Sequence, residues 1–182
     1  MQPEASFSER DLFGGAIKAR LPTMLIDASD LRQVPDTQEV FLYPQSGISV
    51  IVEILERVEA TDNTDAVRFH FDSLAHDNSA ESSQSDSIVI IPNDRGDDTP
   101  SAIVLTGSQK VPKFNQSAAD DVRILMSLFR VEAKRADLVV TFNVPVSSQD
   151  GGAVGEEEWR GAKSDFENMI RSFRIVDYGL FA

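Results

Sequence analysis

Apolar and polar positions alternate along much of the chain, which predicts a fold rich in β-strands. Ile17, Ala19 and Leu21 alternate with their neighbours, as expected for a strand with one face toward water. The pair Gly14 and Gly15, just before this run, permits a tight turn or a bulge. Further runs have strand-like composition, at residues 87–91, 102–113, 122–132 and 138–146. The last two are joined by a short polar segment and are expected to form a hairpin.

Two runs in the next part of the chain are expected to pair with each other. Residues 37–43 are rich in amino acids that favour strands, and residues 44–47 then supply a turn before the apolar run of residues 48–58. Two adjacent antiparallel strands are therefore predicted. The second run also has apolar side chains at helical spacing, so periodicity alone leaves both strand and helix open there.

The segment of residues 61–77 contains two competing periods. Val67, Phe69 and Phe71 alternate with polar neighbours, although the segment also has apolar side chains four and three residues apart. The unbroken alternation and the aromatic side chains favour a strand. Residues 78–87 are almost all polar, and such a composition buries too little surface to offset the entropy of ordering. They are expected to form a mobile loop.

Two other segments carry helix signals. Residues 27–33 begin with capping residues and are expected to form one or two helical turns that end before Pro35. Residues 156–173 begin with acidic side chains and then place apolar ones, starting at Trp159, mostly three and four positions apart, which predicts an amphipathic helix. The elements do not alternate regularly between strand and helix. We therefore expect one domain over residues 1–182, of the α+β class, with a mostly antiparallel sheet covered by helices.

The acidity of the chain narrows the class of partner. Its 182 residues include 17 Lys and Arg against 30 Asp and Glu, which gives a formal net charge of -13. Such a field repels nucleic acid and anionic membrane surfaces, so neither is expected as a partner. A basic protein surface is favoured, because complementary fields raise association rates. The alternative is that the charge only maintains solubility.

Several kinds of chemistry are excluded by what the sequence lacks. Without cysteine there is no disulfide, zinc-thiolate site or cysteine nucleophile, which fits the reducing interior of a cell. We find no secretory signal and no apolar stretch long enough to span a membrane. Signature motifs for phosphate, dinucleotide and zinc chemistry are also missing, so we predict no cofactor, no metal and no catalytic residue. The spacing of His70 and His76 disfavours joint metal binding, and the glycosylation sequon at Asn115 is interpreted as a chance match.

Carboxylates are the remaining candidates for a site. Acidic side chains lie among apolar ones at Asp27, Asp30, Asp36, Glu39, Glu53 and Glu56. Paired carboxylates can do acid–base work or bind a cation, whereas helix caps and solvated faces are the structural alternative. If residues 48–58 form a strand, Glu53 and Glu56 point to opposite faces. A site shared by both would then need a bend in the strand.

Two segments together form a distinctive signature, Leu12-Phe-Gly-Gly-Ala-Ile17 and Ile26-Asp-Ala-Ser-Asp-Leu-Arg-Gln-Val-Pro-Asp-Thr-Gln-Glu-Val-Phe41. Weaker similarity continues in residues 48–56, 69–71, 139–145 and 176–182. With these features the chain resembles the Ran guanine nucleotide release factors, also called the Ran-binding Mog proteins. The resemblance implies a six-stranded, mostly antiparallel sheet with helices on both sides. It also implies binding to the small nuclear GTPase Ran, promotion of nucleotide release and a role in nuclear protein import, in the nucleus and the cytoplasm.

The resemblance further implies which residues bind the partner. These are Asp27, Asp30, Arg32, Asp36, Gln38, Glu39, Glu53 and Glu56. We expect the acidic members to form a patch that engages basic residues of Ran near its nucleotide and competes with the phosphates for the same cations. Release would follow if nucleotide-free Ran binds more tightly than loaded Ran. Two alternatives stay open: an adaptor that binds Ran or a transport receptor without altering exchange, and an enzyme that uses some of Asp36, Glu39 and Glu53 as acid and base.

Overall fold

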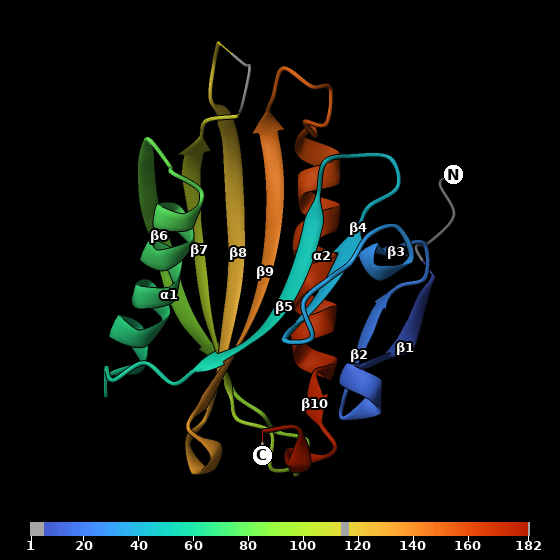
Figure 1. Ribbon diagram of the computed structural model, residues 1–182, viewed down its shortest axis with the longest axis vertical. Coiled ribbons are helices and arrows are strands. Elements are labelled where there is room, and N and C mark those ends of the chain that lie inside the picture. Colours follow the sequence, from blue (N-terminus) through green and yellow to red (C-terminus); the bar gives the residue numbers. More distant parts are fainter. Residues whose placement is uncertain (1–5, 114–116, 182) are drawn as a thin grey trace.

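The computed structural model describes residues 6–113 and 117–181, whose strands form two antiparallel sheets. The strands of the larger sheet are β3 (Ile26–Asp27), β4 (Gln38–Leu42), β5 (Ser49–Glu56), β6 (Ser82–Ile91), β7 (Ala102–Val111), β8 (Asp120–Val131) and β9 (Ala136–Ser147). They lie in the order β3-β4-β5-β9-β8-β7-β6 (Figure 1). The strands of the smaller sheet are β1 (Phe7–Leu12), β2 (Ile17–Pro22) and β10 (Arg174–Ile175), in the order β1-β2-β10.

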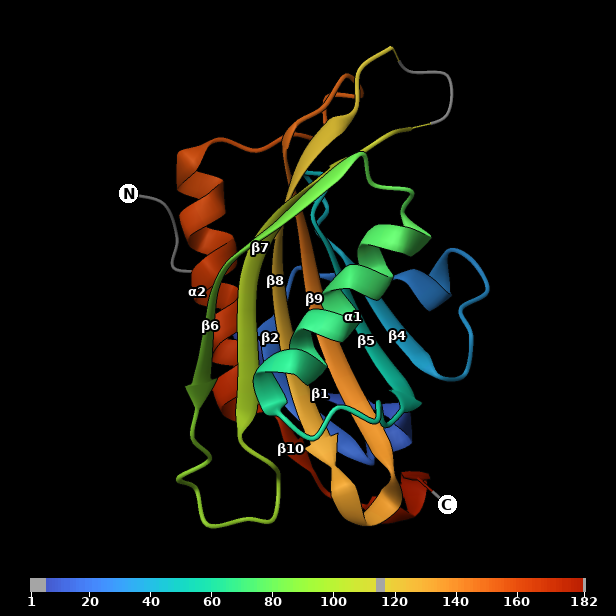
Figure 2. The same cartoon turned by 90° about the vertical axis from the view of Figure 1, so that its left-hand side faces the viewer.

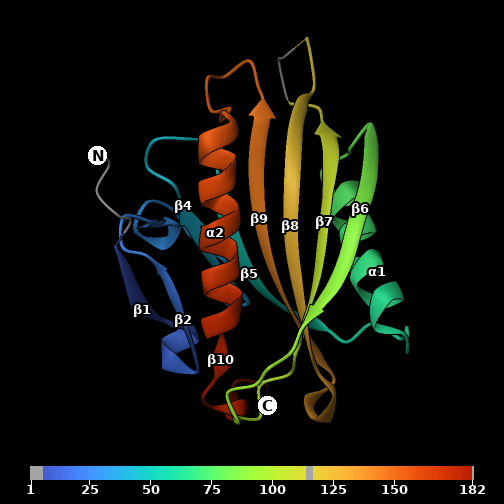
Figure 3. The same cartoon turned by 180° about the vertical axis from the view of Figure 1, so that it is seen from behind.

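Two α-helices cover opposite faces of the larger sheet. They are α1 (Asn63–Asp77) and α2 (Glu156–Ser172). Figure 2 shows α1 crossing one face, and Figure 3 shows α2 running along the other beside the smaller sheet. The short 3-10 helices are η1 (Phe13–Gly15), η2 (Ala28–Asp30), η3 (Glu132–Lys134) and η4 (Tyr178–Phe181).

The larger sheet is buried on both faces at its centre, because a separate apolar cluster packs against each. On the α2 side, Phe166 packs edge-on against Phe142 of β9, with ring centroids 5.3 Å apart. On the α1 side, Phe71 lies in a smaller cluster with Leu105 and Met126. Successive residues of a strand point to opposite faces, so β8 and β9 supply side chains to both clusters. The sequences of β8 and β9 are therefore nearly continuous apolar runs.

Much of the predicted strand pattern is confirmed. The alternating run from Ile17 forms β2, and the predicted pair around residues 44–47 forms the antiparallel strands β4 and β5. The run of residues 48–58, left open between strand and helix, is a strand because β4 and β9 pair with it on both sides. The predicted hairpin is β8–β9, which turns through η3 and a left-handed Arg135 with φ of 51°. The predicted C-terminal helix is α2.

The prediction of a strand in residues 61–77 is wrong, because these residues contain α1. The Asp62 carboxylate caps the helix by accepting hydrogen bonds from the N–H groups of Thr64 (2.7 Å) and Asp65 (3.2 Å). Phe69, which the strand prediction placed on the same side as Val67 and Phe71, exposes 56% of its surface. The buried side chains are Ala66, Val67, His70 and Phe71. Their spacing is helical, so the alternation of aromatic residues was misleading.

The prediction of a mobile loop over residues 78–87 also differs from the structure. Residues 82–87 form the first part of β6, which pairs with β7 at the edge of the sheet. Their side chains are exposed, so the pairing rests on backbone hydrogen bonds that composition does not reveal. The ladder shifts register between Ser85 and Ser87, as in a β-bulge. The sequon at Asn115 lies outside the described residues.

The α+β class and the antiparallel sheet with helices on both sides are confirmed, although the strand count differs. The resemblance implied six strands, whereas the structure has seven in the larger sheet and three in the smaller one. Short strands account for part of the difference, since β3 and β10 each contain two residues. Within residues 6–113 and 117–181, no helix is both long enough and apolar enough to cross a membrane.

Candidate functional site

The signature segment that starts at Ile26 begins with β3 and then turns into η2. Asp27 is the capping residue of this turn: its carboxylate accepts hydrogen bonds from the backbone N–H of Ser29 (2.9 Å) and from the Ser29 hydroxyl (2.7 Å). A short polar side chain is favoured here because it satisfies a backbone donor that has no partner inside the helix. Asp27 is half-buried, and its role in the structure is to shape the turn.

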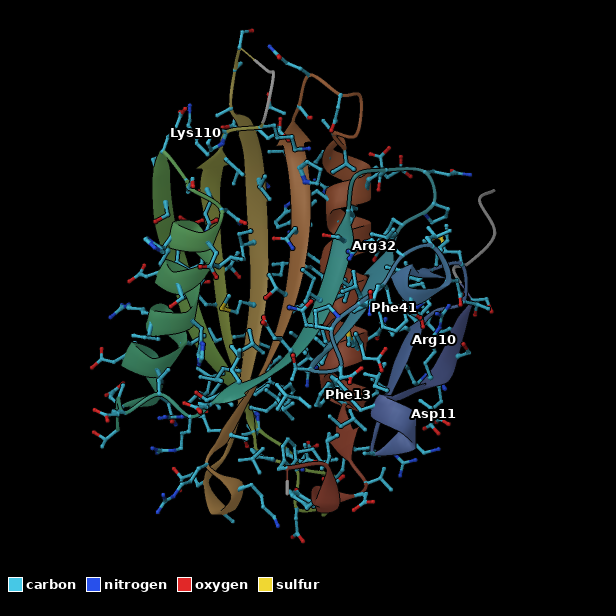
Figure 4. The ribbon with its side chains drawn as sticks, viewed as in Figure 1. Arg10, Asp11, Phe13, Arg32, Phe41 and Lys110 are labelled. Carbon is cyan, nitrogen blue, oxygen red and sulfur yellow. The ribbon has the colours of Figure 1, made fainter. Side chains whose placement is uncertain are left out.

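The connection from η2 to β4 presents exposed members of the candidate set. Asp30, Arg32 and Asp36 are all exposed, and Figure 4 labels Arg32 on this connection. Leu31 between them exposes 68% of its surface. The connection therefore displays charge together with an apolar side chain, a combination suited to a protein partner.

Glu39 points inward, toward the turn that follows β1. Its carboxylate accepts a hydrogen bond from the backbone N–H of Phe13 at 2.7 Å. Burial raises the pKa of Glu39 above its ordinary value, the Phe13 N–H opposes that rise, and the nearby charge of Asp27 adds to it. The turn itself needs left-handed backbone at Phe13, Gly14 and Gly15, with φ of 51°, 68° and 95°. Glu39 thus ties the two halves of the signature together in space.

Arg10 supports the same junction, and sequence reasoning missed it. Its guanidinium donates hydrogen bonds to the carbonyl oxygens of Thr23 (3.0 Å) and Leu25 (2.7 Å) and lies 5.3 Å from the centre of the Phe41 ring. Figure 4 shows Arg10, Phe13 and Phe41 gathered where the β1–β2 hairpin meets β4. No motif marks Arg10, because its partners are backbone carbonyls that any sequence supplies.

Gln38 and Glu53 lie on the other face of the sheet. They are directly paired across β4 and β5, and the Gln38 amide donates a hydrogen bond to the Glu53 carboxylate at 3.2 Å. Glu56 lies at the end of β5 and lines the same hollow as Glu53, between the sheet and α1. The three-residue offset within the strand separates their side chains, because Glu53 pairs with Val139 of the α1-side cluster whereas Glu56 pairs with Ala136 of the α2-side cluster.

The candidate residues therefore share one edge region of the sheet but not one surface. Adjacent residues of a strand face opposite ways, and this alone separates Gln38 from Glu39. Asp27 and Glu39 are engaged by backbone N–H groups, and Asp30, Arg32 and Asp36 face solvent. Glu53 faces α1, and Glu56 borders the same hollow at the end of β5.

This arrangement disfavours the carboxylate enzyme that the sequence left open. Glu39 and Glu53 lie on opposite faces of the sheet, so they cannot act together on one reacting group. Across residues 6–113 and 117–181, no three His, Cys, Asp or Glu side chains are grouped so as to hold a metal ion. Glu39 and Glu53 therefore do not belong to one reaction centre.

His70 belongs to a buried network that anchors α1. Its Nε2 lies 2.8 Å from the Asp137 carboxylate, which also accepts a hydrogen bond from the N–H of Val58 (3.2 Å) and faces Arg130 Nε at 3.4 Å. Arg130 donates to the carbonyl oxygens of Ala60 (2.6 Å) and Val58 (2.7 Å). The network joins β8 and β9 to α1 and to the segment before it.

Comparison with known proteins identifies the family of this chain. The family described as Ran-interacting Mog1 protein matches residues 10–145. The Ran guanine nucleotide release factor of Danio rerio is 36% identical over 182 residues, covering 94% of this chain and 98% of that protein. The Homo sapiens protein of the same name is 36% identical over 177 residues, covering 93% and 94%.

A solved structure is also similar. The crystal structure of the Saccharomyces cerevisiae Ran-binding protein Mog1p matches with a TM-score of 0.72 and 27% identity, covering 98% of this chain and 100% of that one. The match in sequence and the match in fold both extend over nearly the whole chain. This chain therefore belongs to the Ran-interacting Mog1 protein family.

Proposed function

We propose that the chain binds the small GTPase Ran, promotes release of its guanine nucleotide and thereby supports nuclear protein import. The observation that carries the proposal is family membership over nearly the full length, since relatives at 36% identity are named Ran guanine nucleotide release factors. A relative from Schizosaccharomyces pombe, 30% identical over 191 residues, is named a nuclear import protein.

The exposed connection between η2 and β4 is the proposed contact surface. Asp36 in this connection and Asp30 at the end of η2 are acidic and exposed, and the net charge of -13 favours a basic partner. The Asp27 carboxylate caps η2 before this connection. After the connection, Glu39 of β4 accepts a hydrogen bond from the Phe13 N–H. A surface held in this way loses little conformational freedom on binding.

Release needs no covalent chemistry in this mechanism. The acidic side chains attract basic residues of Ran near its nucleotide, so the same cations are less available to the phosphates. Release is promoted only if nucleotide-free Ran is bound more tightly than loaded Ran, because a ligand shifts an equilibrium only by its difference in affinity. Two further acidic members of the candidate set, Glu53 and Glu56, lie at the hollow beside α1 and are not part of the proposed contact surface.

The test is the rate at which Ran loses a fluorescent guanine nucleotide, with and without the protein. We expect acceleration by the wild type. Asp36→Lys should weaken binding to Ran by more than about 1 kcal/mol. Asp94→Lys makes the same charge change at another exposed position, in the loop between β6 and β7, and should bind as the wild type does. Circular dichroism confirms folding of both variants.

The adaptor alternative predicts the same binding with different kinetics. A pull-down against nucleotide-loaded and empty Ran measures the preference directly. Unchanged nucleotide release together with equal capture of both forms would reject the release mechanism and favour the adaptor. No capture of either form would reject the proposed function as a whole.

A further inference from the structure

A hollow of about 300 Å³ lies between α1 and the sheet, on the face opposite α2. On the helix side it is lined by Phe69, Ser73 and Asp77, which are four residues apart and therefore share one face of α1. On the sheet side the lining includes Glu53 and Leu55 of β5. In Figure 2, α1 crosses in front of β8 and β9, with β5 beside it.

The charge around this hollow has one sign. Its acidic lining residues are Glu53, Glu56 and Asp77, and the lining contains neither Lys nor Arg. The basic side chain that it does contain, His70, is buried and lies 2.8 Å from the Asp137 carboxylate. A cation entering the hollow would therefore meet acidic side chains from both the strand side and the helix side.

The apolar part of the hollow needs an apolar partner. Phe69 exposes 56% of its surface at this site, which is unusual for a large aromatic side chain on a helix packed against a sheet. The other apolar residues that line the hollow are Leu55, Val58, Leu74, Met126 and Val139. Covering Phe69 would remove apolar surface from water, which favours binding of an apolar group.

We propose that this hollow docks a segment of a protein partner in which an apolar side chain is flanked by Lys or Arg. The apolar side chain would enter beside Phe69 and Leu55, and the flanking cations would reach Glu53 on one side and Asp77 on the other. A volume of about 300 Å³ is at the lower end for ligand pockets, so it holds one or two side chains of a peptide.

Other occupants fit less well. Anionic ligands such as nucleotides and lipid headgroups would be repelled by the acidic rim. A polyamine would satisfy the carboxylates but would leave Phe69 in water. The peptide is the occupant that uses both the charge and the apolar surface.

Peptide binding by the full chain tests the proposal. The probe is fluorescein-labelled Gly-Lys-Lys-Leu-Lys-Lys-Gly, and a version with Ser in place of Leu has the same charge. Fluorescence anisotropy should show that the Leu peptide binds at least about fivefold more tightly than the Ser peptide, because the buried side chain carries the binding energy. Amide chemical shifts should change mainly on α1 and β5.

Matched variants localise the binding. Phe69→Ser and the double variant Glu53→Gln/Asp77→Asn should each weaken binding of the Leu peptide about fivefold or more. The control Glu157→Gln/Asp94→Asn removes the same number of charges from exposed positions outside the hollow and should leave binding within about twofold of wild type.

Several outcomes would overturn the proposal. Equal binding of the Leu and Ser peptides would mean that charge alone is responsible. Equal loss in the control variant, or displacement of the Leu peptide by an equal concentration of spermine, would lead to the same conclusion. The measurement uses no GTPase and leaves Asp30 and Asp36 unchanged, so its failure would not bear on the proposed function.

Discussion

Removing the Asp137 carboxylate should test how strongly the buried network holds α1 in place. The side chain of Asp137 is fully buried, and that of Arg130 is 4% exposed. In Asp137→Ala, Arg130 loses its opposite charge, while the Val58 N–H and His70 lose an acceptor. Breaking a buried ion pair by removing one partner typically costs about 3–5 kcal/mol, because an uncompensated charge remains inside. We expect a loss of that size, a large part of the stability of an ordinary domain.

An exposed ion pair provides the matched control. Glu132 pairs with Arg57 at 3.3 Å, and its side chain is 74% exposed. Glu132→Ala should cost less than about 1 kcal/mol, because solvent screens such a pair. The double variant Asp137→Ala/Arg130→Met should lose less stability than the sum of its single variants, since it removes both members of a coupled pair.

Urea unfolding measures these differences directly. Trp159 is the single tryptophan of the chain and is 6% exposed, so its fluorescence reports on the core beneath α2, while circular dichroism follows the backbone. A lower urea midpoint with an unchanged slope would indicate lost stability without a change in the unfolded state. If Asp137→Ala lost no more stability than Glu132→Ala, the network would contribute nothing net and this reasoning would be refuted.

Two further predictions concern the same structure. Burial raises the pKa of Asp137, but the hydrogen bonds from His70 and Val58 and the charge of Arg130 outweigh it and hold the pKa below its ordinary 3.8. This stabilisation is present above pH 3.8 and is lost as pH falls through the lower folded value, so acid unfolding should be steeper for wild type than for Asp137→Asn. Glu39→Ala should cost about 1–3 kcal/mol in thermal unfolding, because it leaves the Phe13 N–H without an acceptor. Glu39→Gln keeps an acceptor and should cost less, and equal losses would contradict this explanation.

The candidate site was only partly predictable. The signature identified the segment that contains the candidate residues. Their spacing in the sequence did not show that strand geometry places them on different faces of the sheet. Arg10 acts through the carbonyl oxygens of Thr23 and Leu25, and such contacts leave no pattern in the sequence. Phe69 was placed with Val67 and Phe71 on the apolar side of a strand, whereas it lies exposed at the hollow beside α1.

The local pattern of apolar residues was sufficient to predict an element wherever that element's own residues determine its structure. The apolar stripe of α2 and the long apolar runs of β8 and β9 are legible in sequence, because their periods match the helix or the doubly buried strand. The α+β class follows from the order of these elements.

Tertiary contacts decided the remainder. The polar residues 82–87 form a strand only because β7 offers backbone partners, and residues 63–77 form a helix because the sheet buries one helical face of them. The sequence by itself determined the class of fold, the family and the acidic character of the surface. The tertiary structure decided which acidic side chains are exposed and which accept hydrogen bonds from the backbone. The reason is that the backbone N–H donors come from residues far away in the sequence.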